Sequence, residues 1–169
     1  MAVIEELYFA VPIYFSNMAP VFARKLNFFN KPLNRNLFGE HKTYRGFIVA
    51  IIVGLFVVYF QKYLYGFDFF KQISLINYTE INLIYLGFFS GFGAMLGDLI
   101  KSYFKRKQNI KPGESWVPFD QLDFMIGALI FLSVFLEFQN ILILLVLTPF
   151  IHIIANHIGY FLGLNNVKW

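Results

Sequence analysis

The feature that most constrains this chain is a succession of apolar runs long enough to cross a lipid bilayer. The clearest run covers residues 47–65 and contains one charged residue, Lys62, close to its end. A helix needs about 20 mainly apolar residues to span the hydrocarbon core. Runs of comparable length cover residues 4–22, 81–99, 119–138 and 141–164. The sequence therefore predicts an all-α integral membrane protein with five transmembrane helices.

Composition supports this class over a soluble one. The chain has 169 residues, of which 58% are hydrophobic and 14% charged, against about 45–50% and about 25% in an average soluble protein. This length predicts a single membrane-embedded domain over residues 1–169. Glu5 and Glu6 stand where a signal peptide would be basic, so we expect the first run to be a membrane span. The absence of cysteine excludes disulfides and thiolate metal sites.

The distribution of basic residues predicts the orientation. Six Lys or Arg residues fall between the first and second runs, five fall between the third and fourth, and Lys168 follows the fifth. Only Lys62 and Lys71 fall on the opposite side. Cytoplasmic loops carry the excess of Lys and Arg. We therefore expect an outside N-terminus, a cytoplasmic C-terminus, cytoplasmic loops at about 23–46 and 100–118, and an active site that faces the cytoplasm from the plasma membrane.

Acidic and basic residues concentrate between the third and fourth runs, in GDLIKSYFKRKQNIKPGESWVPFDQLD at residues 97–123. If the third run continues as helix, Asp98, Ser102 and Lys105 or Arg106 lie on one face. Asp120 and Asp123, three residues apart, share a face of the next helix. Carboxylates beside cations at a membrane interface suit a phosphorylated substrate, because Asp oxygens hold Mg²⁺ and Lys or Arg neutralise phosphates.

A second basic segment, GEHKTYRG at residues 39–46, precedes the second run. Lys42, Thr43 and Arg45 supply two cations and a hydroxyl at a helix entrance, where phosphate binding is favoured. A solvated loop beside anionic lipid would have a similar composition. Asn17, towards the end of the first run, could line a site or form a hydrogen bond between helices.

Other interpretations of the acidic residues stay open. Asp120 follows Pro118 and could cap the fourth helix, with Asp123 favoured by the helix dipole. Asp98 could pair with Lys101 or Ser102 within its own helix. Gly87, Gly91, Gly93 and Gly97 form two pairs with the spacing of close helix packing, and Asn156 with Tyr160 fits a packing hydrogen bond.

These motifs resemble the CDP-archaeol synthase family, membrane cytidylyltransferases distantly related to phosphatidate cytidylyltransferase. The resemblance rests on Gly97-Asp98-x-x-x-Ser102-x-x-Lys105-Arg106, Pro112-Gly113, Asp120-Gln121-x-Asp123-Phe124, Asn17 with its flanking prolines, GEHKTYRG, and the tail NHIGYFLGLNNVKW. It implies transfer of CMP from CTP to 2,3-bis-O-geranylgeranylglycerol 1-phosphate, giving CDP-archaeol and pyrophosphate with Mg²⁺ as cofactor.

The resemblance also suggests roles for individual residues. The expected catalytic residues are Asp98, Lys105, Arg106, Asp120 and Asp123, of which the three aspartates would hold the metal. The expected substrate-binding residues are Asn17, Lys42, Thr43, Arg45, Ser102, Gln121 and Asn156. Partners would be CTP, a lipid phosphate and membrane lipids, with no nucleic acid and no protein partner inferable.

The chain departs from the family pattern at one place. The family usually carries an acidic Asp-Gly element before its Gly-Lys-Thr segment, whereas residues 30–41 read NKPLNRNLFGEH. Another lipid phosphate, such as phosphatidate, is therefore an alternative substrate. A small membrane transporter is a further alternative, although no internal repeat supports it. The DGxxARx₈Gx₃D pattern of CDP-alcohol phosphatidyltransferases is absent.

Overall fold

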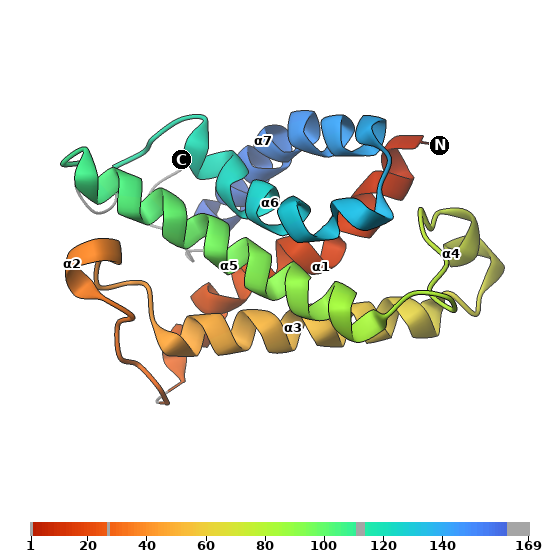
Figure 1. Ribbon diagram of the computed structural model, residues 1–169, viewed down its shortest axis with the longest axis horizontal. Helices are drawn as coiled ribbons and strands as arrows, with labels where there is room; N and C mark the ends of the chain where they lie inside the picture. Colours follow the sequence, from red (N-terminus) through yellow and green to blue (C-terminus); the bar gives the residue numbers. More distant parts are fainter. Residues whose placement is uncertain (1, 27, 111–113, 162–169) are drawn as a thin grey trace.

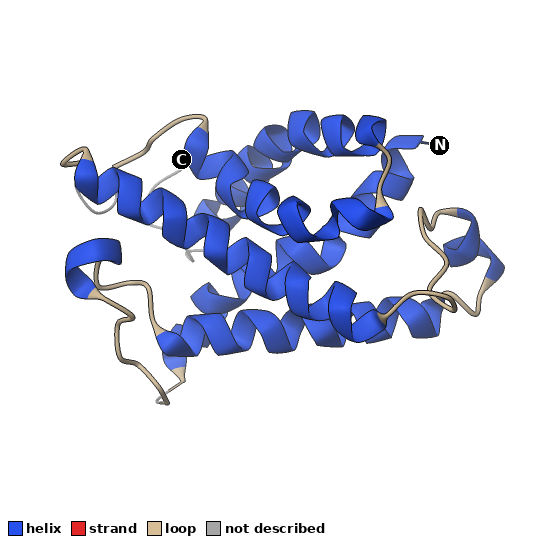
Figure 2. Cartoon of the chain, in the orientation of Figure 1, coloured by secondary structure: helices blue, strands red, loops and turns tan. Residues whose placement is uncertain are grey.

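The computed structural model describes residues 2–26, 28–110 and 114–161, and the named elements of this part of the chain are all helices (Figures 1 and 2). Their order is α1 (Ala2–Phe22), η1 (Ala23–Lys25), α2 (Arg35–Phe38), α3 (Tyr44–Leu64), α4 (Asp68–Gln72), α5 (Leu83–Lys107), α6 (Phe119–Leu132), η2 (Ser133–Phe135) and α7 (Phe138–Phe161). The all-helical prediction is confirmed.

Helix α5 is the centre of the bundle and lies between α3 and α6 (Figure 1). Towards α3, a Cβ atom on Gly91 would come within 2.5 Å of the Ala50 carbonyl oxygen, and one on Gly54 within 2.5 Å of the Gly87 carbonyl oxygen. Only glycine allows the two backbones to approach this closely. The first of the two predicted glycine pairs, Gly87 and Gly91, therefore packs against α3.

The second glycine pair packs against α6. A Cβ atom on Gly93 would come within 2.6 Å of the Ala128 Cα, and one on Gly97 would collide with the Asp123 carbonyl oxygen. Positions 91 and 93 are two residues apart and point to different sides of the helix. The single helix α5 thus makes close backbone contacts with two neighbours, and its C-terminal turns are held against the beginning of α6.

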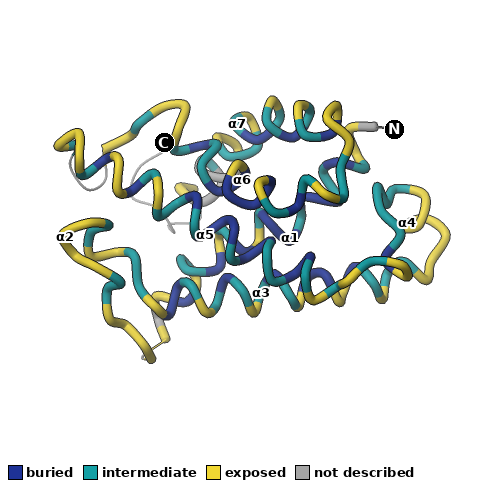
Figure 3. The backbone as a smooth tube through the Cα atoms, in the orientation of Figure 1, coloured by how far each residue is buried: buried dark blue, intermediate teal, exposed yellow. Residues whose placement is uncertain are grey.

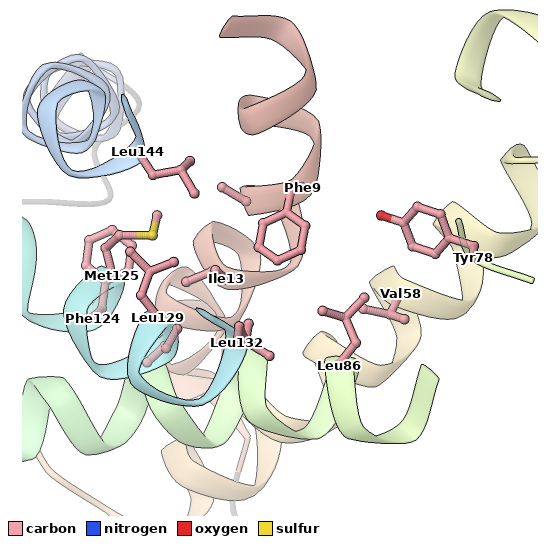
Figure 4. Close-up of a cluster of buried hydrophobic side chains, with 13 residues drawn as sticks. Phe9, Ile13, Val58, Tyr78, Leu86, Phe124, Met125, Leu129, Leu132 and Leu144 are labelled. Atoms are coloured by element: carbon pink, nitrogen blue, oxygen red, sulfur yellow. The ribbon is translucent and has the colours of Figure 1, made fainter. Parts of the chain in front are cut away.

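The buried core joins all the long helices (Figure 4). Phe9 and Ile13 of α1 pack with Leu86 of α5, while Phe124 of α6 and Leu144 of α7 close the opposite side (Figure 4). Each of these side chains is at most 1% exposed. This core holds the bundle together along its middle and leaves its two ends for loops.

Large apolar side chains also cover outward faces of the bundle, where Figure 3 shows exposed and half-buried stretches along the helices. On α3, Ile52, Phe56 and Phe60 are 57%, 70% and 51% exposed. Contiguous exposed apolar surface of this kind marks contact with a membrane or a partner. Helices α3 and α5 are long and apolar enough to cross a bilayer. Five spans remain a prediction.

Two helix ends differ from the predicted ones by six residues or more. Helix α5 continues to Lys107, so residues 100–107, expected in a loop, are helical and extend the functional face. Helix α6 ends at Leu132 instead of residue 138 and is followed by η2. The Asn140 side chain accepts the backbone N–H of Glu137 at 3.2 Å. Asn140 lies within α7, which begins at Phe138 instead of residue 141.

The segment before α3 folds back on itself at one end of the bundle, beside the C-terminal turns of α5 (Figure 1). The Leu33 N–H donates to the Lys42 carbonyl at 2.7 Å, and the Tyr44 N–H donates to the Lys31 carbonyl at 3.2 Å. The short helix α2 forms its tip, capped by the Asn34 side chain. We call residues 28–43 the folded segment. It places Lys42 next to α5.

Candidate functional site

The site begins where α3 starts. Thr43 is the N-cap of this helix, and its hydroxyl accepts the Gly46 N–H at 3.2 Å. Two residues on, Arg45 is 5% exposed. Its guanidinium donates to the Leu26 carbonyl, and its backbone N–H donates to the Phe29 carbonyl at 3.0 Å. Arg45 therefore ties the folded segment to the end of α1.

Helix α5 contributes a charged face, as its spacing predicts. Asp98 pairs with Lys42 across the gap between the folded segment and α5. Ser102 is buried, and its hydroxyl donates to the Asp98 carbonyl at 2.7 Å. Lys105 is 8% exposed and donates to the Glu114 carbonyl at 2.5 Å.

The three predicted aspartates meet around one ammonium group. Lys101 Nζ lies 3.1 Å from Asp98 Oδ1, 3.1 Å from Asp120 Oδ1 and 2.7 Å from Asp123 Oδ2. Lys105 Nζ adds contacts of 3.1 Å to both oxygens of Asp120. The close crossing of α5 and α6 brings these residues together, because Gly97 touches the backbone of Asp123.

We call Lys42, Lys101, Lys105, Asp98, Asp120 and Asp123 the charged cluster. It holds three cations and three carboxylates, so its formal charges balance. The paired side chains are only 6–25% exposed. Removing charges from water is costly, and replacing buried ion pairs by apolar residues is often neutral or stabilising. A cluster this dense is more readily explained by chemistry than by stability.

A polar cavity of about 350 Å³ adjoins the cluster on the side of α1 and α3. Asn17 of α1, Lys42 and Arg45 beside α3, and Asp98 of α5 line it. A second cavity of about 290 Å³ is lined by Gly39, Glu40, His41, Lys42, Lys101, Ser102, Lys105 and Arg106, among others. Glu40, His41 and Lys42 border both cavities, so the two flank the Lys42–Asp98 ion pair.

A third cavity lies between α5 and α6 and has about 550 Å³. Its walls are mainly apolar, from Ile100, Phe104, Phe119, Leu122, Ile126 and Ile130. It also reaches Lys101 and Asp123 of the charged cluster. An apolar cavity therefore ends at the same charges that border the polar cavities.

Most of the predicted site residues lie together at this end of the bundle. The residues that line the polar cavities or belong to the charged cluster are Asn17, Lys42, Thr43, Arg45, Asp98, Ser102, Lys105, Arg106, Asp120 and Asp123. Gln121 is buried at the start of α6 and does not line these three cavities. Asn156 lies within α7, but its side chain is outside the part that the structure describes.

Of the alternative interpretations of the aspartates, capping of α6 by Asp120 is wrong, whereas the pairing of Asp98 with Lys101 is present. The N-cap residue of α6 is Pro118 and not Asp120. The Asp120 carboxylate instead accepts the backbone N–H of Trp116. Asp98 does pair with Lys101 in its own helix. This pairing does not explain the site fully, because Lys101 also contacts two aspartates of α6.

Sequence reasoning missed the central position of Lys101. The only signal is its spacing of three residues from Asp98, which equally fits a local pair within one helix. Its contacts with α6 depend on how closely α5 and α6 pack. Glu40 and His41 were also missed, since nothing in the sequence places the folded segment over α5.

The three aspartates supply oxygen ligands that suit a hard cation, but the ammonium group of Lys101 occupies the point on which they converge. Carboxylate oxygens of three aspartates surround its ammonium group at 2.7–3.1 Å, and oxygen ligands are those that Mg²⁺ prefers. Among the described residues no three acidic or histidine side chains form a ready metal site. The aspartates fit a cation if Lys101 withdraws.

Fold and site together define a helical membrane protein with a charged, phosphate-compatible site at one end of its bundle. A solved structure described as an intramembrane enzyme for archaeal membrane lipids biosynthesis shares this fold, with a TM-score of 0.71 and 21% identity. The similarity covers 91% of this chain and 94% of that one.

Sequence comparison identifies the family. Residues 1–169 match the family model described as CarS-like, CDP-archaeol synthase. The CDP-archaeol synthase of Methanocaldococcus jannaschii is 35% identical over 97% of this chain and 96% of its own length. That of Thermococcus kodakarensis is 34% identical over 96% of this chain and 94% of its own. The chain belongs to the CDP-archaeol synthase family, as its motifs suggested.

Proposed function

We propose that this protein transfers the CMP group of CTP to the phosphate of 2,3-bis-O-geranylgeranylglycerol, giving CDP-archaeol and pyrophosphate. A lipid phosphate oxygen forms a bond to the α-phosphorus of CTP, and the bond from that phosphorus to the bridging oxygen of pyrophosphate breaks. Membership of the CDP-archaeol synthase family supports the reaction. The same membership supports an archaeal lipid phosphate as the acceptor.

The observation that carries this proposal is the junction of two kinds of cavity at one charged cluster. The polar cavities suit a nucleoside triphosphate, and the apolar cavity suits a lipid chain. Lys101 and Asp123 lie at the boundary. A reaction between a nucleotide and a lipid phosphate needs both environments to meet at the reacting phosphorus.

The chemistry asks for positioning and charge stabilisation. The lipid phosphate is already an ionised nucleophile, so no general base is required. The main obstacle is repulsion between two anions, which preorganised cations reduce. Lys42 and Arg45 face the first polar cavity, and Lys105 and Arg106 face the second. These four cations would hold the phosphates of CTP on either side of the Lys42–Asp98 pair.

Mg²⁺ is the proposed cofactor, bound by Asp98, Asp120 and Asp123. When bound there, it would lower the repulsion between phosphates and stabilise the departing pyrophosphate. The convergence of the three carboxylates on one point supports this assignment. Mg²⁺ would bind there only after the Lys101 ammonium group has moved away from the carboxylates.

The proposed setting is the plasma membrane, with residues 1–169 as one domain of five spans and the charged cluster on the cytoplasmic side. The exposed apolar face of α3 and the membrane family support an intramembrane location. The bias of Lys and Arg towards the loops at the site supports the cytoplasmic side. CTP is available there.

The experiment is pyrophosphate release by detergent-purified protein with CTP, Mg²⁺ and either the archaeal ether-lipid phosphate or phosphatidate. Asp98→Asn and Asp123→Asn keep side-chain size but remove a charge, and we expect each to lower turnover by about 100-fold or more. Asp68→Asn, on exposed α4 away from the cluster, is the matched control and should keep wild-type activity.

Release that depends on lipid and is lost only in the two cluster variants supports the transferase. Preference for phosphatidate would show that phosphatidate, and not the archaeal ether-lipid phosphate, is the lipid substrate. Folded wild-type protein that binds CTP but turns over neither lipid would overturn the proposal in favour of a binding or transport role.

A further inference from the structure

The apolar cavity between α5 and α6 contains a single cation among its described lining residues, Lys101. The aliphatic stem of a lysine packs against apolar neighbours while its ammonium group reaches a polar boundary. Here the boundary is sharp, because Ile100 and Phe104 line the cavity on the same helix while Asp98 and Lys105 belong to the charged cluster. The cation of this cavity lies where its apolar surface ends.

Lys101 also lines the second polar cavity, together with Ser102, Lys105 and Arg106. Among the residues that the structure describes, it is the only lysine or arginine that borders both the apolar cavity and a polar one. Lys42, by comparison, borders the two polar cavities and not the apolar one. A ligand in the apolar cavity can therefore reach Lys101, whereas Lys42 is accessible only from the polar cavities.

We propose that Lys101 binds the phosphate of the lipid substrate, whose chain lies in the apolar cavity along α5 and α6. This inference rests on the proposed function and adds a residue to it that neither the motifs nor the family name assigns. The ligand is a phosphomonoester carried on an apolar chain. Its phosphate must lie where the apolar cavity meets the charged cluster, and Lys101 is the cation at that place.

The same geometry explains why Lys101 is paired with three aspartates. A lysine held at the end of an apolar cavity without a counter-ion would be costly to bury. Asp98, Asp120 and Asp123 supply that compensation. The flexible four-carbon stem lets the ammonium group exchange a carboxylate for a phosphate over a short distance.

A purely structural role is the competing explanation, in which Lys101 only neutralises the aspartates. Kinetic constants separate the two. A phosphate-binding lysine changes the KM for lipid, whereas loss of a structural counter-ion lowers stability or affects both substrates. Lys101→Met removes the charge and keeps the stem, and Lys101→Arg keeps the charge. Lys107→Met is the matched control, because Lys107 is an exposed lysine six residues further along α5 and lines none of the three cavities.

The lipid assay is run with CTP saturating, and the CTP assay with lipid saturating. We expect Lys101→Met to raise the KM for lipid phosphate about tenfold or more, as for loss of one charge-assisted hydrogen bond. Its KM for CTP should stay within about twofold of wild type. Lys101→Arg should recover part of the loss, and Lys107→Met should match wild type.

Binding without turnover gives a second readout. Trp116 lines the apolar cavity, so its fluorescence in a Trp169→Phe background reports a ligand there. A lipid phosphate with brominated chains should quench Trp116 in wild type and more weakly in Lys101→Met. The corresponding lipid alcohol, which lacks the phosphate, should quench both proteins equally.

An unchanged KM for lipid in folded Lys101→Met protein would overturn the inference, as would equal rises in both KM values or equal loss of quenching by phosphate and alcohol. These results are distinct from failure of the proposed function. In that case wild type itself would show no lipid-dependent pyrophosphate release, and the quenching by lipid phosphate would still decide whether Lys101 binds it.

Discussion

At the scale of single residues, several side chains at the site have a structural task beside their proposed chemical one. Thr43 lines the first polar cavity and also caps α3 through the Gly46 N–H. Ser102 borders the second and donates to the Asp98 carbonyl. Arg45 borders the first and holds the Leu26 carbonyl. A loss of activity on mutation at these positions does not by itself identify a substrate contact.

Thr43 allows the two tasks to be separated. Thr43→Ala removes the cap and should lower the free energy of unfolding by about 1 kcal/mol, while Thr43→Ser keeps the hydroxyl and should not. The measurement is thermal unfolding in detergent, with turnover measured below the transition. If capping is its whole role, Thr43→Ala keeps its KM for CTP. A raised KM in a stably folded variant would show that the hydroxyl also contacts the nucleotide.

At the scale of elements, the site depends on how closely α5 packs on its neighbours. Asp98 and Asp123 lie on different helices and share Lys101 because Gly97 lets the α6 backbone come into contact. Gly127 of α6 completes this crossing against Gly93 and Gly97. A side chain at the crossing would move the aspartates apart as well as disturb packing. Stability and chemistry are therefore coupled at this point.

Gly97→Ala should destabilise the protein by about 1–3 kcal/mol, because the added Cβ collides with the Asp123 carbonyl and neither backbone can yield easily. Turnover should fall further than the folded fraction does, since the carboxylates separate. Gly66→Ala is the control, as its Cβ would meet only the Tyr63 carbonyl at 3.4 Å. Comparable unfolding midpoints for the two variants would contradict this account of the crossing.

At the scale of the whole molecule, the folded segment with α2 lies at one end of the bundle and α4 at the other (Figure 1). The charged cluster adjoins the folded segment through the Lys42–Asp98 pair. The exposed apolar face of α3 runs between these ends. The loops rich in Lys and Arg gather at the site end, which agrees with a cytoplasmic site. Sidedness is a property that direct labelling can test.

The chain contains no cysteine, so single cysteines can be introduced without further changes. Asn36→Cys, on α2 at the site end, should react with a membrane-impermeant maleimide only after cells are opened. Gln72→Cys, on α4 at the other end, should react in intact cells. Both positions are exposed. The reverse labelling pattern would invert the proposed orientation while leaving the fold unchanged.

The sequence by itself determined the class of the protein, the approximate positions of its long helices and the face that Asp98, Ser102 and Lys105 share. These features depend on local order: apolar runs of bilayer length, and side chains that repeat with the helical period. It also supplied most of the polar and charged residues around the polar cavities, because the motifs lie at or near the ends of the predicted spans.

The tertiary structure decided what those residues do to one another. The end of α6 at Leu132, the central place of Lys101 and the separation of polar from apolar cavities all depend on packing between distant segments. No spacing along the chain encodes the distance between α5 and α6. That distance follows from glycine backbones in contact, and it brings Asp120 and Asp123 to Lys101.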